Sequence, residues 1–113
     1  MKKILLLLFC VPLIAFGQTT YIPDDSLEYE LILLGYDNVM DDYVNTASID
    51  TVTILDISNV GVHDMTGIED FISLEELYCY QNNYPILNLN NNTQLKKVDI
   101  LTNFGIDSIF IDN

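Results

Sequence analysis

The sequence predicts an α/β-type repeat solenoid of about three coils, with a parallel strand face and a helix that caps its N-terminal end. Three observations predict this fold class. Apolar residues beyond Thr51 recur with a period of 21–22 residues, each repeat contains a short apolar–polar alternation, and a segment with helical spacing precedes the first repeat. We therefore expect a leader over residues 1–17, a helical cap region over 18–50 and repeats over 51–113.

Length and charge limit the class of protein. The chain has 113 residues and a formal net charge of −13, from 17 Asp and Glu against 4 Lys and Arg. This length allows one small domain. Nucleic-acid phosphates and anionic lipid headgroups repel so acidic a surface, so we expect neither as a partner. Half of the residues are apolar, which favours a folded chain over a disordered one.

The first residues have the pattern of a secretory signal peptide. Lys2 and Lys3 precede an apolar stretch over residues 4–14, and Ala15 and Gly17 place small residues before the expected cleavage point. The stretch is shorter than the roughly 20 apolar residues of a membrane span. We therefore expect export, to the medium or the outer cell surface. The alternative is lipidation at Cys10, but Phe9 stands where a small residue is expected.

Cleavage would change the charge and the cysteine content of the chain. Loss of the two leader lysines takes the net charge from −13 to −15 and leaves Lys96 and Lys97 as the strong bases. Cys79 is then the single cysteine, so packing rather than a disulfide has to hold the exported domain together.

The segment from Tyr21 to Gly35 predicts a helix. Asp24 or Asp25 can cap its N-terminus, Glu28 stands at the capping-box position, and Gly35 can take the left-handed position after its end. The expected buried stripe consists of Leu27, Leu31 and Leu34, widened by Tyr29, Ile32 and Leu33. The open end of the repeat stack is the expected partner of this stripe.

The repeats from residue 51 have the period and internal spacing of leucine-rich repeats. Equivalent apolar positions in successive coils are Val52, Leu74 and Leu95; Leu55, Leu77 and Val98; and Ile57, Cys79 and Ile100. Alternation over residues 55–57, 77–79 and 98–100 predicts three short strands with one face inward. Asn82 and Asn103 keep the same period, and their amides can bond backbone groups of the turns.

The segments that return from each strand differ in pattern. Val62, Met65, Ile68 and Phe71 step by three, which predicts a helical or 3₁₀ return in the first coil. Leu87 alternates with Leu89 and Ile109 with Ile111, so we expect extended returns in the next two coils.

Several stretches resemble a family of secreted leucine-rich-repeat proteins of the Bacteroidetes type. They cover residues 21–25, 34–38, 51–58, 65–71 and 77–82. The resemblance implies a short helical cap before 21-residue repeats, and a non-catalytic interaction module that is secreted or displayed on the cell surface. The family pattern often continues into a C-terminal sorting domain, which this sequence lacks, and its last coil ends on the apolar residues 109–111 without a polar cap.

Outward residues of the three strands form the candidate binding face. Stacking in parallel predicts three columns: Ile54, Glu76 and Lys97; Asp56, Tyr78 and Asp99; and Ser58, Tyr80 and Leu101. Tyrosine provides rigid, amphipathic contact area that suits protein or polysaccharide ligands. The alternative is a solvated sheet on which the tyrosines only cover their neighbours and Glu76 pairs with Lys97.

Other chemistry-bearing residues favour structural roles. Cys79 stands at an inward position and reads as a small buried hydrophobe. His63 belongs to no catalytic or metal-binding motif. Asp37, Asp41 and Asp42 suggest calcium, but their spacing is not that of an EF-hand loop. We therefore expect no metal and no cofactor.

Three functions remain open at this point. The first is a secreted or surface module that binds protein or polysaccharide through the strand face. The second is an N-terminal cap and spacer fragment of a longer surface adhesin, and the third is a small hydrolase, for which no catalytic motif is present. The uncapped last coil also predicts self-association.

Overall fold

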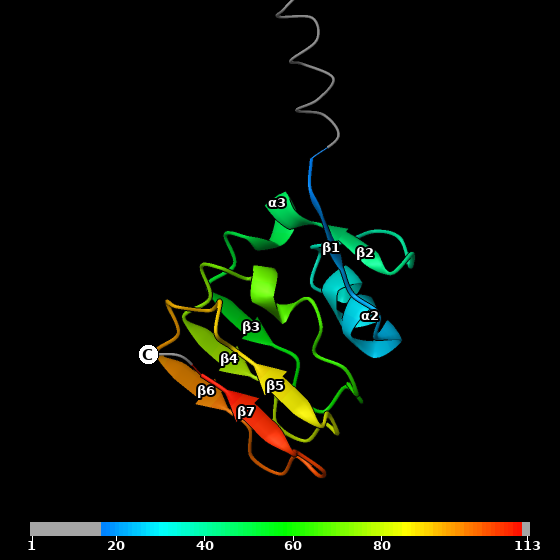
Figure 1. Cartoon of the computed structure of the whole chain (residues 1–113). Coiled ribbons are helices and arrows are strands. Elements are labelled where there is room, and N and C mark those ends of the chain that lie inside the picture. The colour runs from blue at the N-terminus through cyan, green and yellow to red at the C-terminus, as the bar shows by residue number, and fades with distance from the viewer. Residues whose placement is uncertain (1–16, 112–113) are drawn as a thin grey trace, which may run out of the picture.

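The structure is a computed structural model that describes residues 17–111 (Figure 1). It has a repeat-type, β-rich fold with two parallel sheets, one small antiparallel sheet and few helical residues. The expected leader lies outside the described residues except for Gly17. Within residues 17–111, no helix has the length and apolar character that crossing a membrane requires.

The larger parallel sheet contains the three strands expected from the repeat. They are β3 (Ile54–Asp56), β4 (Glu76–Tyr78) and β6 (Lys97–Asp99), in the order β3-β4-β6. Leu55, Leu77 and Val98 are partners in the register, so the strands are offset by one repeat each. The first two of these side chains are buried, because the central residue of each strand faces inward.

The return segments form the opposite side of the repeats. The first contains the 3₁₀ helix η1 (Ile68–Asp70), and the other two contain β5 (Ile86–Asn88) and β7 (Ser108–Phe110). β5 and β7 pair in parallel with Leu87 opposite Ile109. The different returns follow the change from three-residue spacing to alternation in the sequence.

The turn after each strand of the larger sheet contains a left-handed residue at the same repeat position. These residues are Asn59, Gln81 and Thr102, with φ of 55°, 56° and 56°. Asparagine tolerates this conformation better than a β-branched residue does. The backbone of the turn therefore repeats even where the sequence does not.

The N-terminal region is only partly helical, so the expectation of a helical region over 18–50 is wrong in part. β1 (Thr19–Tyr21) and β2 (Tyr43–Asn45) form the antiparallel sheet, with Thr20 opposite Val44. α2 (Asp25–Leu33) lies between them, and the single turn α3 (Thr46–Ile49) follows β2. β1 and β2 do not recur at the repeat period, and three residues of alternation without such a repeat are too few to be recognised in the sequence.

The ends of α2 are set by Asp24 and Gly35. The Asp24 carboxylate accepts a hydrogen bond from the Leu27 N–H at 2.9 Å, and Gly35 has φ of 88°. The capping box expected at Glu28 is wrong, because Glu28 binds the backbone of residues 41 and 42 instead. The expected stripe is also too wide. Leu27 and Leu31 are buried, whereas Leu34, Tyr29 and Leu33 are exposed.

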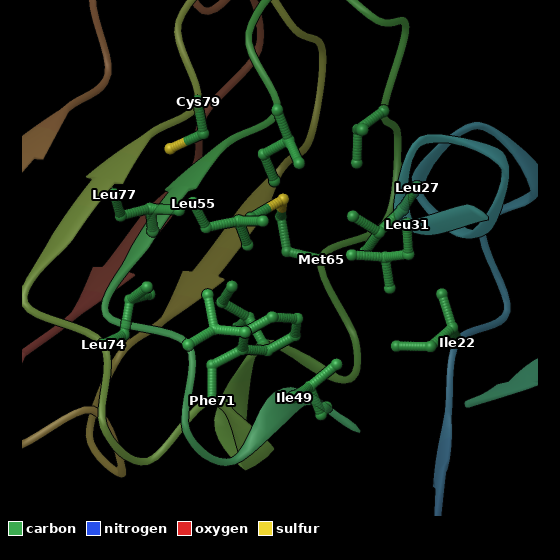
Figure 2. Packing of buried hydrophobic residues seen from close by; sticks show 14 of the residues in the cluster. Ile22, Leu27, Leu31, Ile49, Leu55, Met65, Phe71, Leu74, Leu77 and Cys79 are labelled. Atoms are coloured by element: carbon green, nitrogen blue, oxygen red, sulfur yellow. The ribbon is translucent and has the colours of Figure 1, made fainter. Parts of the chain in front are cut away.

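One apolar cluster joins the N-terminal region to the repeats. Figure 2 shows Leu27 and Leu31 of α2 facing Met65, with Ile22 beside them and the inward residues of β3 and β4 beyond. Eighteen buried residues make up this cluster, and Leu95, Val98, Ile100 and Ile106 pack against it while partly exposed. The core therefore thins out toward β6 and β7.

Candidate binding face

The sheet β3-β4-β6 brings the predicted outward residues into two columns. Ile54 lies opposite Glu76 and Glu76 opposite Lys97. In the second column Asp56 pairs with Tyr78, and Tyr78 with Asp99. Adjacent residues within a column are separated by the distance between neighbouring strands, about 4.8 Å.

The third column continues beyond the ends of the strands. The Asn59 N–H donates to the Tyr80 carbonyl at 2.9 Å, and the Gln81 N–H donates to the Leu101 carbonyl at 3.0 Å. These bonds keep the three segments that follow the strands aligned at Ser58, Tyr80 and Leu101. The nine residues of the three columns therefore lie on one surface, which we call the strand face.

Lys97 contacts the tyrosine of the neighbouring strand. Its Nζ lies 4.8 Å from the centre of the Tyr78 ring, a cation–π geometry. The Glu76–Lys97 pair expected for a purely solvated sheet does not form within residues 17–111. The described ion pair joins Lys96 to Glu75 at 2.6 Å, one residue earlier on each chain. Sequence spacing predicted which residues lie next to Lys97, but it could not predict which of them the Lys97 side chain contacts.

Two acidic residues of the strand face accept hydrogen bonds from backbone N–H groups of the turns. Asp56 accepts a hydrogen bond from the Ser58 N–H at 3.0 Å, and Asp99 accepts one from the Leu101 N–H at 3.1 Å. Each bond uses one carboxylate oxygen, so the charge and the other oxygen remain available to a ligand. The strand face is therefore a firmly held acidic surface with Tyr78 and Tyr80 half-buried in it.

Asn82 and Asn103 support the strand face from inside. Asn82 Oδ1 accepts from the N–H groups of residues 60, 61 and 62, and its Nδ2 donates to Ile57 O at 2.8 Å and Cys79 O at 3.2 Å. Asn103 Oδ1 accepts from the Asn82 N–H at 2.9 Å. These bonds link the turn of each coil to the next.

Two supporting residues escaped the sequence analysis. Tyr84 is fully buried, and its hydroxyl donates to Cys79 O at 3.2 Å. Asn92 is buried and donates to Ile68 O at 2.8 Å and Phe71 O at 3.1 Å. The first coil has other amino acids at the equivalent positions, so periodicity gave no signal for these hydrogen bonds. Burial raises the pKa of the Cys79 thiol to about 11, which keeps it protonated at neutral pH.

A cluster of carboxylates lies between α2 and the loop before β2. Glu28, Asp37 and Asp41 bring oxygens within 4.8 Å of one another. Glu28 is buried, and it accepts from the Asp41 N–H at 2.9 Å and the Asp42 N–H at 3.1 Å. Burial raises the pKa of Glu28 and the two N–H donors oppose this rise. The sequence pointed to the aspartates of this loop, but it placed Glu28 in a capping box, whereas the structure shows that Glu28 holds the loop to the helix.

A groove of about 590 Å³ lies between the first return segment and β5. His63, Glu69, Ile86 and Asn88 are among its lining residues. The His63 side chain is exposed, and its Nδ1 lies 3.2 Å from the Asn83 carbonyl. None of the predicted strand-face residues lines this groove.

Comparisons with known proteins relate the chain to bacterial surface proteins. No family model matches it. Internalin J of Listeria monocytogenes is 35% identical over 81 aligned residues, and the match covers 68% of this chain. The solved functional domain of that protein, described as including a cysteine ladder, superposes with a TM-score of 0.59 over 70% of this chain at 35% identity.

Two solved structures from Clostridium perfringens ZmpB are also similar. One contains the CBM51-2 domain in complex with GlcNAc together with INT domains, and matches 72% of this chain at 26% identity and a TM-score of 0.59. The other, also of CBM51-2 and INT domains, matches 73% at 25% identity and a TM-score of 0.60. The chain spans 9% of the length of the curated internalin, and 18% and 17% of the chains in the first two solved structures. These likenesses support a leucine-rich-repeat-like surface protein.

Proposed function

We propose that the chain is a non-catalytic, exported leucine-rich-repeat module that binds a protein or polysaccharide through its strand face. The observation that carries this proposal is the register of β3, β4 and β6, which aligns two tyrosines with flanking acids on one surface. Short parallel strands present such residues at fixed spacing, so little conformational entropy is lost on binding.

The chemistry of the strand face suits a ligand with hydroxyl or basic groups. Asp56, Glu76 and Asp99 offer carboxylate acceptors, and Tyr78 and Tyr80 offer ring faces and hydroxyls. Sugars and basic protein surfaces both provide donors for such acceptors. The likeness to a structure that contains GlcNAc makes GlcNAc oligomers the first carbohydrate to test.

Finer parts of the proposal rest on the sequence. The solenoid with a helical cap is supported by α2, whose Leu27 and Leu31 join the repeat core. Export is supported by the leader pattern over residues 1–17. The Bacteroidetes type rests on the sequence resemblance alone, because the matched proteins come from Listeria and Clostridium. The non-catalytic role is supported by the protonated thiol of Cys79 and by the missing catalytic motifs.

Binding to immobilised GlcNAc oligomers and to a panel of surface proteins tests this function. The exported chain, residues 18–113, is compared with the double variant Y78A/Y80A. A binder that uses the strand face should lose at least about tenfold in affinity, since buried aromatic contacts contribute about 2 kcal/mol or more at binding surfaces. Tyr29→Ala is the matched control, because Tyr29 lies on α2 and is exposed.

Two results would contradict the proposal. One is equal affinity of Y78A/Y80A and the native chain for a probe that binds. The other is the absence of binding to both the sugars and the proteins at millimolar concentration, which would favour the spacer function below.

The alternative is a cap and spacer segment of a longer surface adhesin, with no ligand site of its own. It is supported by the partly exposed Val98 and Ile100, whose equivalents Leu77 and Cys79 are fully buried. In this function a further coil would cover β6 and β7. Reading the gene beyond codon 113 distinguishes the two, because additional 21-residue repeats favour the spacer.

A further inference from the structure

The centre of the strand face holds a positive charge that the chain itself provides. Tyr78 lies on the middle strand, with Asp56 opposite it on one side and Asp99 opposite it on the other. Lys97 reaches across from β6, and its Nζ lies 4.8 Å from the centre of the Tyr78 ring. An aromatic ring attracts a cation at this distance. The middle of the strand face therefore accommodates a cation.

The groups around the Tyr78 ring favour a positive charge. The Tyr78 hydroxyl raises the pKa of Lys97 above its ordinary value, and the carboxylates of Glu76 and Asp99 add to this rise. The nine residues of the strand face include three acids and one base, so the surface stays net negative with Lys97 in place. The strand face therefore attracts a cationic ligand in addition to its own lysine.

Two aspartates stand on either side of the Tyr78 ring. The backbones of Asp56 and Asp99 are two strand spacings apart, about 9.6 Å. One oxygen of each carboxylate accepts a turn N–H, at 3.0 Å from Ser58 and 3.1 Å from Leu101. These bonds orient both side chains and leave the second oxygen of each to a ligand. A flat guanidinium can stack on the ring and donate to both aspartates, which a lysine ammonium cannot do.

Lys97 has a second partner close by. Glu76 lies directly opposite Lys97 in the register of β4 and β6. Within residues 17–111 the two side chains form no ion pair while the ammonium lies over Tyr78. A Lys97 side chain that leaves the ring can turn to Glu76 and keep an ionic partner. Its displacement by a ligand therefore costs little.

These contacts favour a protein over a sugar as the occupant. Tyr78 and Tyr80 are half-buried, and Lys97 lies over the Tyr78 ring. A neutral sugar would have to displace Lys97 without bringing a charge that replaces it. An arginine brings that charge, and arginine and tyrosine are both enriched among the residues that dominate protein–protein binding.

We propose that the strand face binds an exposed arginine of a basic protein segment, and that Lys97 occupies the place of this arginine until the partner binds. The guanidinium stacks on Tyr78 and donates to Asp56 and Asp99. Lys97 then turns to Glu76. The inference rests on the proposed function and names the partner of the same surface. It makes Lys97 an internal competitor, so removal of the Lys97 charge should strengthen binding.

Titration of residues 18–113 with a blocked glycine–serine peptide that carries arginines at alternate positions tests the inference. Low salt is used, because ions screen exposed charges. We expect a Kd of about 1 mM or lower. The same peptide with citrulline in place of arginine should bind at least about tenfold more weakly, because citrulline keeps the shape of the side chain without its charge.

Lys97→Met distinguishes replacement of the lysine from general charge attraction. It removes the ammonium and keeps an aliphatic side chain, so the affinity for the arginine peptide should rise about threefold or more. Lys96→Met is the matched control, because it changes the net charge equally. Lys96 pairs with Glu75 at 2.6 Å and lies outside the strand face, so this variant should change the affinity less than about twofold.

Asp56→Asn and Asp99→Asn test the two flanking carboxylates. An asparagine oxygen can still accept the turn N–H, so each variant keeps the local backbone bond and loses only the charge. Each should weaken binding of the arginine peptide about fivefold. Thermal unfolding of every variant shows that it is folded.

Several results would overturn the inference. They are no binding of the arginine peptide at millimolar concentration, equal binding of the citrulline peptide, no gain with Lys97→Met, equal gains with both lysine variants, and unchanged binding by both aspartate variants. If the arginine peptide does not bind, but GlcNAc oligomers bind and lose affinity in Y78A/Y80A, the inference is wrong and the proposed function stands. If the arginine peptide binds Y78A/Y80A as tightly as the native chain, both are wrong.

Discussion

At the scale of the residue, Gly67 fixes the N-terminal region against the first coil. Its φ is 105°, and a Cβ at this position would lie 2.8 Å from the Tyr21 carbonyl and overlap the Ile22 side chain. Glycine is therefore required twice, for the left-handed backbone and for the close approach of β1. Glu69 Oε2 accepts a hydrogen bond from the Gly67 N–H at 2.8 Å and holds the turn in place.

Gly67→Ala should lower the free energy of unfolding by about 3 kcal/mol or more, from backbone strain and overpacking together. Gly61→Ala is the control, because Gly61 has φ of 81° but its Cβ would meet only Ser26 Oγ at 3.8 Å. That variant should lose only about 1 kcal/mol. Chemical denaturation measures both losses, and equal losses would show that the contact with β1 contributes nothing.

Sequence reasoning at this scale worked where a residue repeats. Leu55, Leu77 and Asn82 were located by period alone, because each coil places the same demand on the same position. It failed at Glu28, whose hydrogen-bond donor Asp41 lies 13 residues away in the sequence. It also failed at Tyr84, whose hydroxyl bond to the Cys79 carbonyl occurs in one coil only. A buried carboxylate that accepts two loop N–H groups leaves no periodic signal.

At the scale of the element, Asn82 connects strands and turns that sequence separates. Its side chain binds the backbones of residues 57, 60, 61, 62 and 79. Asn82 is 3% exposed, so water cannot replace these bonds. One amide therefore links the turns of the first two coils, in addition to the backbone bonds between β3 and β4.

Asn82→Ala should cost about 3 kcal/mol or more of folding stability, because several buried backbone groups lose their partners together. Asn91→Ala is the control at an exposed position and should change stability by less than about 0.5 kcal/mol. Urea denaturation of both variants measures the difference. A loss at Asn82 as small as that at Asn91 would refute the structural role of the amide.

The contact between α2 and the loop before β2 should depend on pH. Burial raises the pKa of Glu28 above its ordinary value, so folding favours its protonated form. Its stabilising contribution is then fully present below the ordinary pKa and is lost as the pH rises through the raised value. The native chain should therefore gain stability relative to Glu28→Gln when the pH falls from 7 to 4.

The free energy of unfolding of the native chain and of Glu28→Gln is measured from pH 7 to pH 4. The difference between them isolates the titration of Glu28, because both proteins contain all the other carboxylates. Glu30→Gln on the same helix serves as the control and should show no such relative gain, since Glu30 accepts none of the loop hydrogen bonds. A relative stability of Glu28→Gln that stays constant with pH would contradict the raised pKa.

At the scale of the whole molecule, the repeat period predicted the two parallel sheets. The non-repeating N-terminal region offered few such signals, and its antiparallel sheet was not predicted. The register of β3, β4 and β6 matches the 21–22-residue period, and the extended returns appear as β5 and β7. The sheet of β1 and β2 could not be foreseen, because it joins residues 19–21 to residues 43–45 across α2. Contacts between distant, non-repeating segments depend on packing that a single sequence does not display.

The candidate site was predictable to the same extent. The columns of the strand face followed from the period, but the position of Lys97 over Tyr78 required side-chain geometry. The acidic charge is the reason why we expect neither nucleic acids nor anionic membranes as partners, and why we propose sugars or basic proteins instead. The central claim is that such a ligand binds at the strand face.

The most direct measurement is a nuclear magnetic resonance titration of residues 18–113 with the strongest-binding probe from the sugar and protein panel. The account predicts that amide shifts change over residues 54–58, 76–80 and 97–101 and remain constant in α2 and around His63. Changes confined to the groove lined by His63, Glu69 and Asn88 would contradict it, because binding would then occur away from the strand face.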